Sequence, residues 1–120
     1  MPENHLGAFE QLVLLAILRL GDNAYGTTIR REIEVRAKRK TLIGALYRTL
    51  HRMERQGLIE SELGAVTPKR GGRAKRFVTI NSAGREALKT SMQGIRRLAP
   101  ERFSVWEEVS DAPTPKVSED

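Results

Sequence analysis

Residues 64–77, GAVTPKRGGRAKRF, combine a glycine pair with five cations, a composition suited to contacts with phosphate. Such a segment can cradle a nucleotide phosphate, form an unfolded RNA-binding arm, or make the tip of a β-hairpin. It lacks the GxxxxGK[ST] spacing, and no strand-to-helix turn surrounds it, so a nucleotide cradle is a poor explanation. The flanks, residues 58–63 and 76–80, have strand length and β-forming residues, which favours a hairpin with a basic tip. The five cations are Lys69, Arg70, Arg73, Lys75 and Arg76.

A second group of candidate residues lies on the predicted helix 41–56. Helical spacing predicts one shared outer face for Ala45, Arg48, Thr49, Arg52 and Arg55. Arginine can bind guanine through two hydrogen bonds, and short side chains let a helix backbone come close to a groove. Arginines on a helix face are more often simple solvated surface, so this pattern alone leaves both interpretations open.

The ends of that helix carry their own signals. Thr41 is a possible N-cap, and Gly57 is the predicted stop. Tyr47 lies at the edge of the exposed face, where its hydroxyl could contact a phosphate, although a packing role is nearly as good an explanation.

The net charge of +6 is concentrated in the middle of the 120-residue chain. Residues 25–56 hold nine lysines and arginines against three acidic residues, whereas residues 100–120 hold two against six. A basic middle suggests a polyanionic partner, most simply nucleic acid, and a solvated basic surface explains the charge equally well. The chain has no cysteine, no evident secretory signal and no apolar run of membrane-spanning length, so we expect a cytoplasmic protein without a membrane partner.

No catalytic constellation is present in the sequence. Glu60 and Glu62 share one side of a predicted strand, but no acid or base partner accompanies them. His5 and His51 are the two histidines, and they do not lie at metal-ligand spacing. We therefore predict that the protein is not an enzyme and has no catalytic residue, no metal site and no cofactor.

Apolar spacing predicts three helices, a hairpin and a fourth helix. The first is apolar nearly all round, so it is either central to the domain or helps make a subunit interface through Phe9 and Leu12. Thr27 or Thr28 is predicted to cap the second helix. A mainly α fold with a two-stranded β-hairpin, a basic third helix and a basic hairpin tip describes a winged helix-turn-helix. In that fold the third helix enters the major groove, and the tip reaches phosphates or the minor groove.

The fourth helix, residues 82–99, begins at the cap Asn81-Ser82 and has a narrow apolar seam. Pairing with the same helix of a second subunit would bury that seam. We therefore predict a DNA-binding domain over residues 1–81, a dimerisation helix and extension over 82–106, and an acidic, disordered tail over 107–120. The seam includes Leu88, Met92, Ile95 and Leu98.

Over residues 6–98 the chain resembles the PadR family of bacterial transcriptional regulators. The resemblance is carried by ordered motifs along the chain: Leu6-Gly7 with Glu10, Tyr25-Gly26-x-x-Ile29, GALYRTLHRMExxGLI over residues 44–59, GGRAKRF over 71–77, and Ile80-Asn81-x-x-Gly84. It implies a homodimeric DNA-binding repressor whose carboxy-terminal helix makes the dimer, often released by a small molecule.

This resemblance and the fold lead to a sequence-specific repressor that binds a palindromic operator near its own or a neighbouring gene. We expect DNA contacts from the five tip cations and from Thr41, Ala45, Tyr47, Arg48, Thr49 and Arg52. Ala45 stands where the family often has threonine or serine, and it could still meet a thymine methyl group. Family members that hold aromatic drugs between subunits carry a tryptophan in the dimerising helix. Trp106 lies beyond that helix, so a small-molecule effector stays unassigned.

The alternative function is a winged-helix module for protein–protein contact without a DNA target. Protein partners favour aromatic and apolar anchors on the exposed face of the third helix. The sequence indicates arginines and no exposed aliphatic cluster there, which favours DNA.

Overall fold

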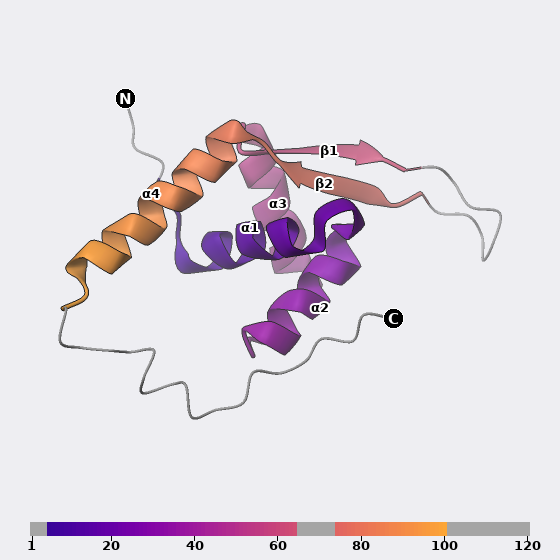
Figure 1. Cartoon of the computed structure of the whole chain (residues 1–120). Helices are drawn as coiled ribbons and strands as arrows, with labels where there is room; N and C mark the ends of the chain where they lie inside the picture. Colours follow the sequence, from indigo (N-terminus) through magenta and orange to yellow (C-terminus); the bar gives the residue numbers. More distant parts are fainter. Residues whose placement is uncertain (1–4, 65–73, 101–120) are drawn as a thin grey trace.

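The structure, a computed structural model, describes residues 5–64 and 74–100. Helices α1, α2 and α3 form a body from which the hairpin and α4 extend in opposite directions (Figure 1). The predicted mainly α fold with a two-stranded hairpin is confirmed. In chain order the elements are α1 (Ala8–Leu20), the 3-10 turn η1 (Gly21–Asn23), α2 (Gly26–Arg36), α3 (Ile43–Arg55), β1 (Ile59–Leu63), β2 (Arg76–Ile80) and α4 (Ser82–Leu98).

Helix α1 is the centre of the body, and it contacts α2, β2 and α4. Val13, Leu14 and Ile17 are at most 2% exposed, which explains why its sequence is apolar on more than one side. Phe9 and Leu12 are half-buried and pack against the same core. The protomer itself therefore covers part of the surface that the sequence offered to a second subunit.

The start of α3 differs from the prediction, because Thr41 is not its N-cap. The Thr41 hydroxyl donates to the carbonyl of Arg39 at 3.1 Å, and the Thr41 N–H donates to the Glu34 carboxylate at 3.0 Å. Thr41 is only 5% exposed as a result. Leu42 takes the N-cap position and offers no side-chain hydrogen bond.

The end of α3 follows the prediction. Gly57 has φ 77°, in the left-handed region that glycine adopts without a steric penalty. Its N–H donates to the carbonyl of Glu54, and the N–H of Leu58 donates to that of Met53, both at 3.0 Å. These two bonds satisfy the last carbonyls of the helix and turn the chain into β1.

The hairpin is antiparallel, with Ile59 opposite Ile80 and Leu63 opposite Arg76. The N–H of Val78 donates to the carbonyl of Ala24 at 2.8 Å, so the segment after η1 adds a bond to the edge of β2. The hairpin tip, with Lys69, Arg70 and Arg73, lies outside the described residues. Phe103, Trp106 and the rest of residues 101–120 also lie outside them.

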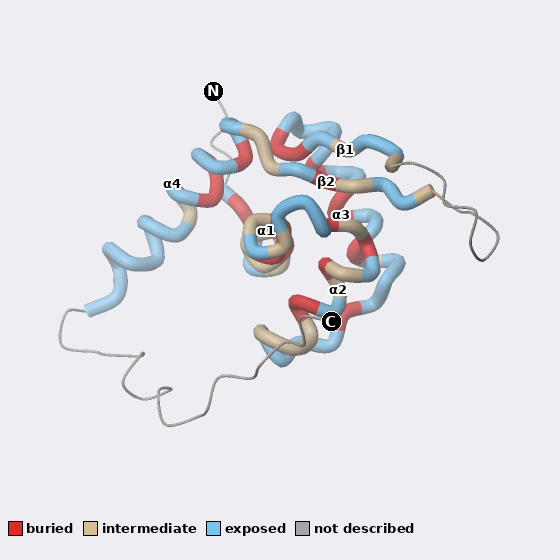
Figure 2. The backbone as a smooth tube through the Cα atoms, turned by 45° about the vertical axis from the view of Figure 1, so that its right-hand side comes forward, coloured by how far each residue is buried: buried red, intermediate tan, exposed pale blue. Residues whose placement is uncertain are grey.

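Helix α4 is fixed to the body at its start and exposed at its end (Figure 2). The Asn81 carboxamide accepts from the N–H of Gly84 at 2.9 Å and donates to the carbonyl of Gly57 at 2.8 Å, which confirms the predicted cap. Ala87 and Leu88 are buried in the protomer. Leu88 therefore belongs to the core, which corrects its assignment to an intersubunit seam. No helix within residues 5–64 and 74–100 combines the length and apolarity that crossing a bilayer requires.

Candidate nucleic-acid interface

The outer face of α3 is polar and basic. Gly44, Arg48, His51 and Arg55 are all exposed, and their spacing of i, i+4, i+7 and i+11 places them on one helix face. The Arg48 Nη1 atom lies 3.6 Å from where a side chain on Gly44 would begin, so this glycine leaves a shallow surface beside the guanidinium. Among the residues that the structure describes, Arg48 and Arg55 form no ion pair. This face can therefore offer both guanidinium groups to a ligand.

The buried arc of α3 is wider than the sequence suggested. Thr49 is 5% exposed, so its predicted place on the outer face is wrong. Ala45 is half-buried at the border of the two faces. Helix α3 packs against both α2 and β1, so more than one side of it faces the protein.

Arg52 is engaged inside the protomer. Its Nε and Nη2 atoms donate to one carboxylate oxygen of Glu10 at 3.3 and 3.1 Å, and the other oxygen accepts from the Gly7 N–H at 2.8 Å. The Glu10 side chain is 15% exposed and that of Arg52 is 45% exposed. Arg52 thus ties α3 to the start of α1, and any contact with a phosphate would have to share or displace Glu10.

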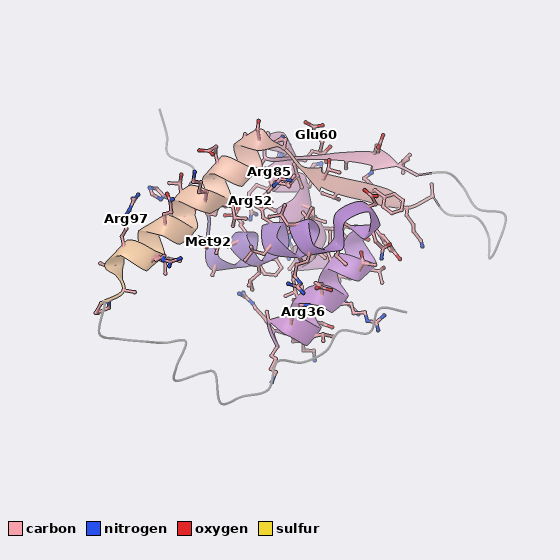
Figure 3. The ribbon with its side chains drawn as sticks, in the orientation of Figure 1. Arg36, Arg52, Glu60, Arg85, Met92 and Arg97 are labelled. Atoms are coloured by element: carbon pink, nitrogen blue, oxygen red, sulfur yellow. The ribbon has the colours of Figure 1, made fainter. Side chains whose placement is uncertain are left out.

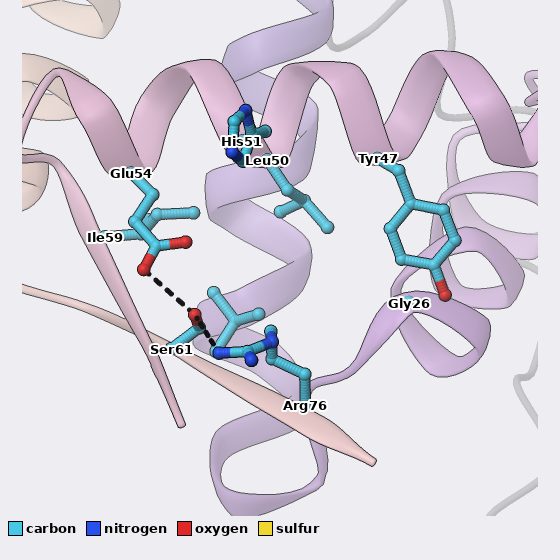
Figure 4. A pocket seen from close by; sticks show the side chains of 9 residues that line it. Gly26, Tyr47, Leu50, His51, Glu54, Ile59, Ser61 and Arg76 are labelled. Atoms are coloured by element: carbon cyan, nitrogen blue, oxygen red, sulfur yellow. Dashed lines mark hydrogen bonds between the residues drawn. The ribbon is translucent and has the colours of Figure 1, made fainter. Parts of the chain in front are cut away.

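Tyr47 has the packing role that its sequence position allowed, and it is also exposed. Its side chain is exposed at 54%, yet its ring lies against Gly26 at the start of α2 (Figure 4). A Cβ atom on Gly26 would collide with the Tyr47 hydroxyl and would lie 2.9 Å from Cε1. The glycine of the Tyr25-Gly26 motif therefore leaves room for the Tyr47 ring in the position that it occupies. The N-cap of α2 is Tyr25, and the Thr28 hydroxyl accepts from its N–H at 3.0 Å. Of the two threonines predicted to cap this helix, Thr28 therefore takes part in the capping interaction.

The start of α3 is more apolar on its surface than expected. Leu42 is 70% exposed and Ile43 is 37% exposed, and the partly exposed Tyr47 lies one turn after Ile43. The prediction of no exposed aliphatic cluster on this helix is wrong, because Leu42 and Ile43 form one at its start. Spacing alone does not reveal this exposure, because adjacent aliphatic residues such as Val13 and Leu14 are both buried in α1.

Two of the five cations in residues 64–77, Lys75 and Arg76, are held by contacts with other side chains. The Lys75 ammonium lies 4.6 Å from the centre of the Tyr25 ring and donates to the Tyr25 hydroxyl at 3.3 Å. The Tyr25 ring meets Phe77 edge-on at 5.5 Å between ring centres. This stack orients Lys75 while its side chain stays on the surface.

Arg76 is held by a polar chain between the hairpin and α3 (Figure 4). It donates to the Ser61 hydroxyl at 3.2 Å, and that hydroxyl donates to the Glu54 carboxylate at 3.0 Å. Glu54 is the only acidic residue of α3. Because this carboxylate is turned toward the hairpin, the outer face around Arg48 keeps its positive character.

Other arginines have structural roles. Glu32 is 7% exposed and accepts from Arg19 at 3.1 Å and from Arg36 at 2.7 Å, which joins α1 to α2. Arg39 lies over the Phe9 ring, 5.0 Å from its centre. Some of the described cations therefore make contacts within the protomer, and others are exposed on its surface without an ion pair.

His51 and Gly44 lie on the candidate interface although the sequence pattern did not point to them. Helical spacing centred on Arg48 places both on one face, whereas the predicted face of Ala45, Arg48, Thr49 and Arg52 is centred closer to Thr49. The Glu10–Arg52 and Tyr25–Lys75 contacts join residues 42 and 50 positions apart, and local spacing carries no signal for such pairs. No cluster of three potential metal ligands occurs in residues 5–64 and 74–100.

Comparisons with known proteins agree with this arrangement. A family model described as the transcriptional regulator PadR-like family matches residues 14–90. The transcriptional regulator Rv3488 of Mycobacterium tuberculosis is 43% identical over 58 residues, which are 48% of this chain and 50% of that protein. The matched segment thus spans about half the length of this curated relative.

Two solved structures have a similar fold. A PadR family transcription regulator from Clostridium difficile is 26% identical with a TM-score of 0.57, covering 76% of this chain and 91% of that one. A transcriptional regulator from Clostridium thermocellum is 20% identical with a TM-score of 0.62, covering 73% and 80%.

Proposed function

The chain belongs to the transcriptional regulator PadR-like family, and from this premise we propose that it is a homodimeric, sequence-specific DNA-binding repressor. In this proposal α3 enters the major groove and the hairpin binds phosphates of the DNA backbone. The targets are promoters of its own or neighbouring genes.

The observation that carries the proposal is the exposed face of α3. Arg48 and Arg55 project from it without an ion pair among the described residues, and Gly44 leaves the helix backbone accessible beside them. His51 adds hydrogen-bonding nitrogen atoms to the same face. Guanine presents two acceptors to the major groove, and one guanidinium can bind both. Arg48, near the middle of this face, is the residue to which we assign base recognition.

The hairpin supports the proposal through charge and placement. Lys75 and Arg76 lie where β2 begins, and their contacts to Tyr25 and Ser61 hold them in place. Cations on such a hairpin bind phosphate and position the protein without specifying a sequence. The tip cations Lys69, Arg70 and Arg73 lie outside the described residues, and in this proposal they also bind phosphates.

Replacing Arg76 with alanine tests the hairpin. We expect the affinity for specific and non-specific DNA to fall by a similar factor. The slope of log affinity against log salt should become less steep by about 1 for each protomer bound, because one phosphate contact is lost. Arg97→Ala removes the same charge from the far end of α4 and should leave the slope unchanged (Figure 3). An unchanged slope for Arg76→Ala would contradict the hairpin assignment.

Replacing Arg48 with alanine tests base recognition. We expect a loss of about 1–3 kcal/mol of discrimination at one base pair of each half-site, with specificity elsewhere retained. Competition binding between the preferred site and single-base variants measures this discrimination. Arg48→Lys keeps the charge but not the two-point geometry, so it should also lose discrimination while keeping the salt slope. Full discrimination in both variants would remove Arg48 from its assigned role.

The exposed end of α4 supports a dimer. Met92, Ile95 and Leu98 are 44, 62 and 85% exposed, and they recur on one side of a helix that extends beyond the body (Figure 3). Contact with the same side of a second α4 would bury this stripe through a two-fold axis. A two-fold dimer would place two recognition helices on half-sites about 34–36 Å apart.

Repression itself is tested in cells. A reporter gene under the bound promoter should be expressed more strongly when the protein is absent, and Arg48→Ala should reproduce that increase. A decrease on removal of the protein would instead identify an activator.

A protein–protein module without a DNA target is the second candidate, because Leu42, Ile43 and Tyr47 are exposed at the start of α3. Apolar and aromatic anchors of this kind are common at protein interfaces. This candidate predicts weak binding to DNA with no sequence preference, which the competition measurement distinguishes from the first.

A further inference from the structure

The start of α3 departs from two local preferences at a single residue. Leu42 is the N-cap, where Ser, Thr, Asp and Asn are favoured because their side chains accept hydrogen bonds from the first N–H groups of the helix. Its side chain is also 70% exposed, more than any other large apolar side chain described in α1, α2 or α3 or their connections. Departures from local preference occur mainly at functional or strained sites.

The backbone of Leu42 is fixed by its neighbours. Thr41 before it is held by the Glu34 carboxylate and by the carbonyl of Arg39, at 3.0 and 3.1 Å. The carbonyl of Leu42 accepts from the N–H of Leu46 at 3.0 Å, which is the first bond of α3. An apolar side chain presented from a fixed backbone needs little further ordering when it binds.

The surroundings of Leu42 are suited to a polyanion with an apolar group. Lys40 is exposed before it, and Gly44 and Arg48 are exposed after it, so a small apolar surface lies among cations. The first residues of a recognition helix are those that contact base edges. The major groove presents one apolar group, the C5-methyl group of thymine.

We propose that Leu42 contacts a thymine methyl group in the major groove and so favours thymine at one position of each half-site. This inference rests on the proposed DNA binding by α3. In this proposal the side chain of Leu42 contacts the methyl group of one base. Arg48, further along the helix, contacts the polar edge of another base.

Deoxyuridine in place of thymidine tests the inference, because it removes only the methyl group. Each thymine of a duplex carrying the selected site is replaced in turn, and affinities are measured at one salt concentration for the wild type and for Leu42→Ala. For the wild type, one position per half-site should lose about fourfold in affinity, the factor expected for one buried methyl group. Leu42→Ala should bind the two duplexes equally at that position and keep its discrimination at all others.

Leu63→Ala is the matched control. Leu63 is 60% exposed at the end of β1, and a hairpin that contacts phosphates or the minor groove meets no thymine methyl group, so the loss with deoxyuridine should persist in this variant. If no deoxyuridine duplex binds more weakly than its thymidine counterpart, or if Leu42→Ala keeps the loss, the inference is wrong while DNA binding stands. If the wild type binds no duplex with sequence preference, the inference falls together with the proposed function.

Discussion

Replacing Ile95 with aspartate is expected to convert the protein into a folded monomer. Ile95 is 62% exposed in the protomer, between Met92 and Leu98 on the apolar stripe of α4. A two-fold interface contains each side chain twice, and burial of one isoleucine contributes about 1.5–3 kcal/mol. The dimer dissociation constant should therefore rise by at least about 100-fold. Sedimentation equilibrium over a range of concentrations measures it.

The same substitution should weaken DNA binding strongly while the fold is kept. Two recognition helices in one dimer reinforce each other, so loss of the dimer should reduce affinity for a two-half-site duplex by on the order of 100-fold or more. The fold should be unaffected, because an exposed substitution changes stability by about 0.5 kcal/mol or less.

Gln93→Asp is the control for Ile95→Asp, since Gln93 lies on the opposite side of the same helical turn and is also exposed. It adds the same charge and should leave the dimer intact. A dimer of unchanged stability with Ile95→Asp would show that α4 does not pair through this stripe.

Replacing Gly84 with alanine is expected to destabilise the protein by about 2–3 kcal/mol. A Cβ atom on Gly84 would collide with the carbonyl oxygen of Leu58 and would lie 2.7 Å from Cγ1 of Ile80. The Leu58 backbone cannot move aside easily, because its carbonyl also accepts from the N–H of Asn81 at 3.2 Å. Thermal unfolding at fixed protein concentration should show a Tm lower by on the order of 10 °C.

Gly94→Ala is the matched control in the same helix. Among the described residues, no atom beyond its own helical turn lies within 4 Å of the position that its Cβ would take. Alanine should therefore fit and raise stability by about 0.5–1 kcal/mol through its better helix propensity. The two substitutions are chemically identical, but Gly84→Ala should lower the free energy of unfolding and Gly94→Ala should raise it. Equal effects would mean that α4 does not lie against Leu58 as described.

The order of elements was predictable because the local signals agree with the tertiary structure. Gly57 and Asn81 occupy their predicted positions because a left-handed turn and a helix cap each have a specific residue requirement. The Ile80-Asn81-x-x-Gly84 motif ends in glycine because any larger residue would place a Cβ atom against the carbonyl oxygen of Leu58.

The site was less predictable, because burial depends on which neighbours a helix has. Thr49 and Leu88 appear on favourable faces by spacing, but packing against other elements covers both. Arg52 appears available by spacing, yet Glu10 holds it from a position 42 residues away. Exposure of Leu42 follows from the late start of α3, which depends on the bonds that hold Thr41.

These contacts divide α3 into parts with different tasks. Leu46, Leu50 and Met53 hold it to the core, and Arg52 joins it to α1 through Glu10. Arg48 remains on the outer face without a partner among the described residues. A helix fixed on its inner face and available on its outer face suits recognition of a rigid duplex.

The most direct test of sequence-specific recognition by α3 is selection of bound fragments from genomic DNA by the wild type and by Arg48→Ala in parallel. We predict that the wild type enriches fragments with an inverted repeat whose half-site centres lie about 34–36 Å apart, one helical turn. Arg48→Ala should lose the preference at one base pair in each half-site. Enrichment of no common sequence by the wild type, or of the same sequence with equal preference by both proteins, would contradict this account.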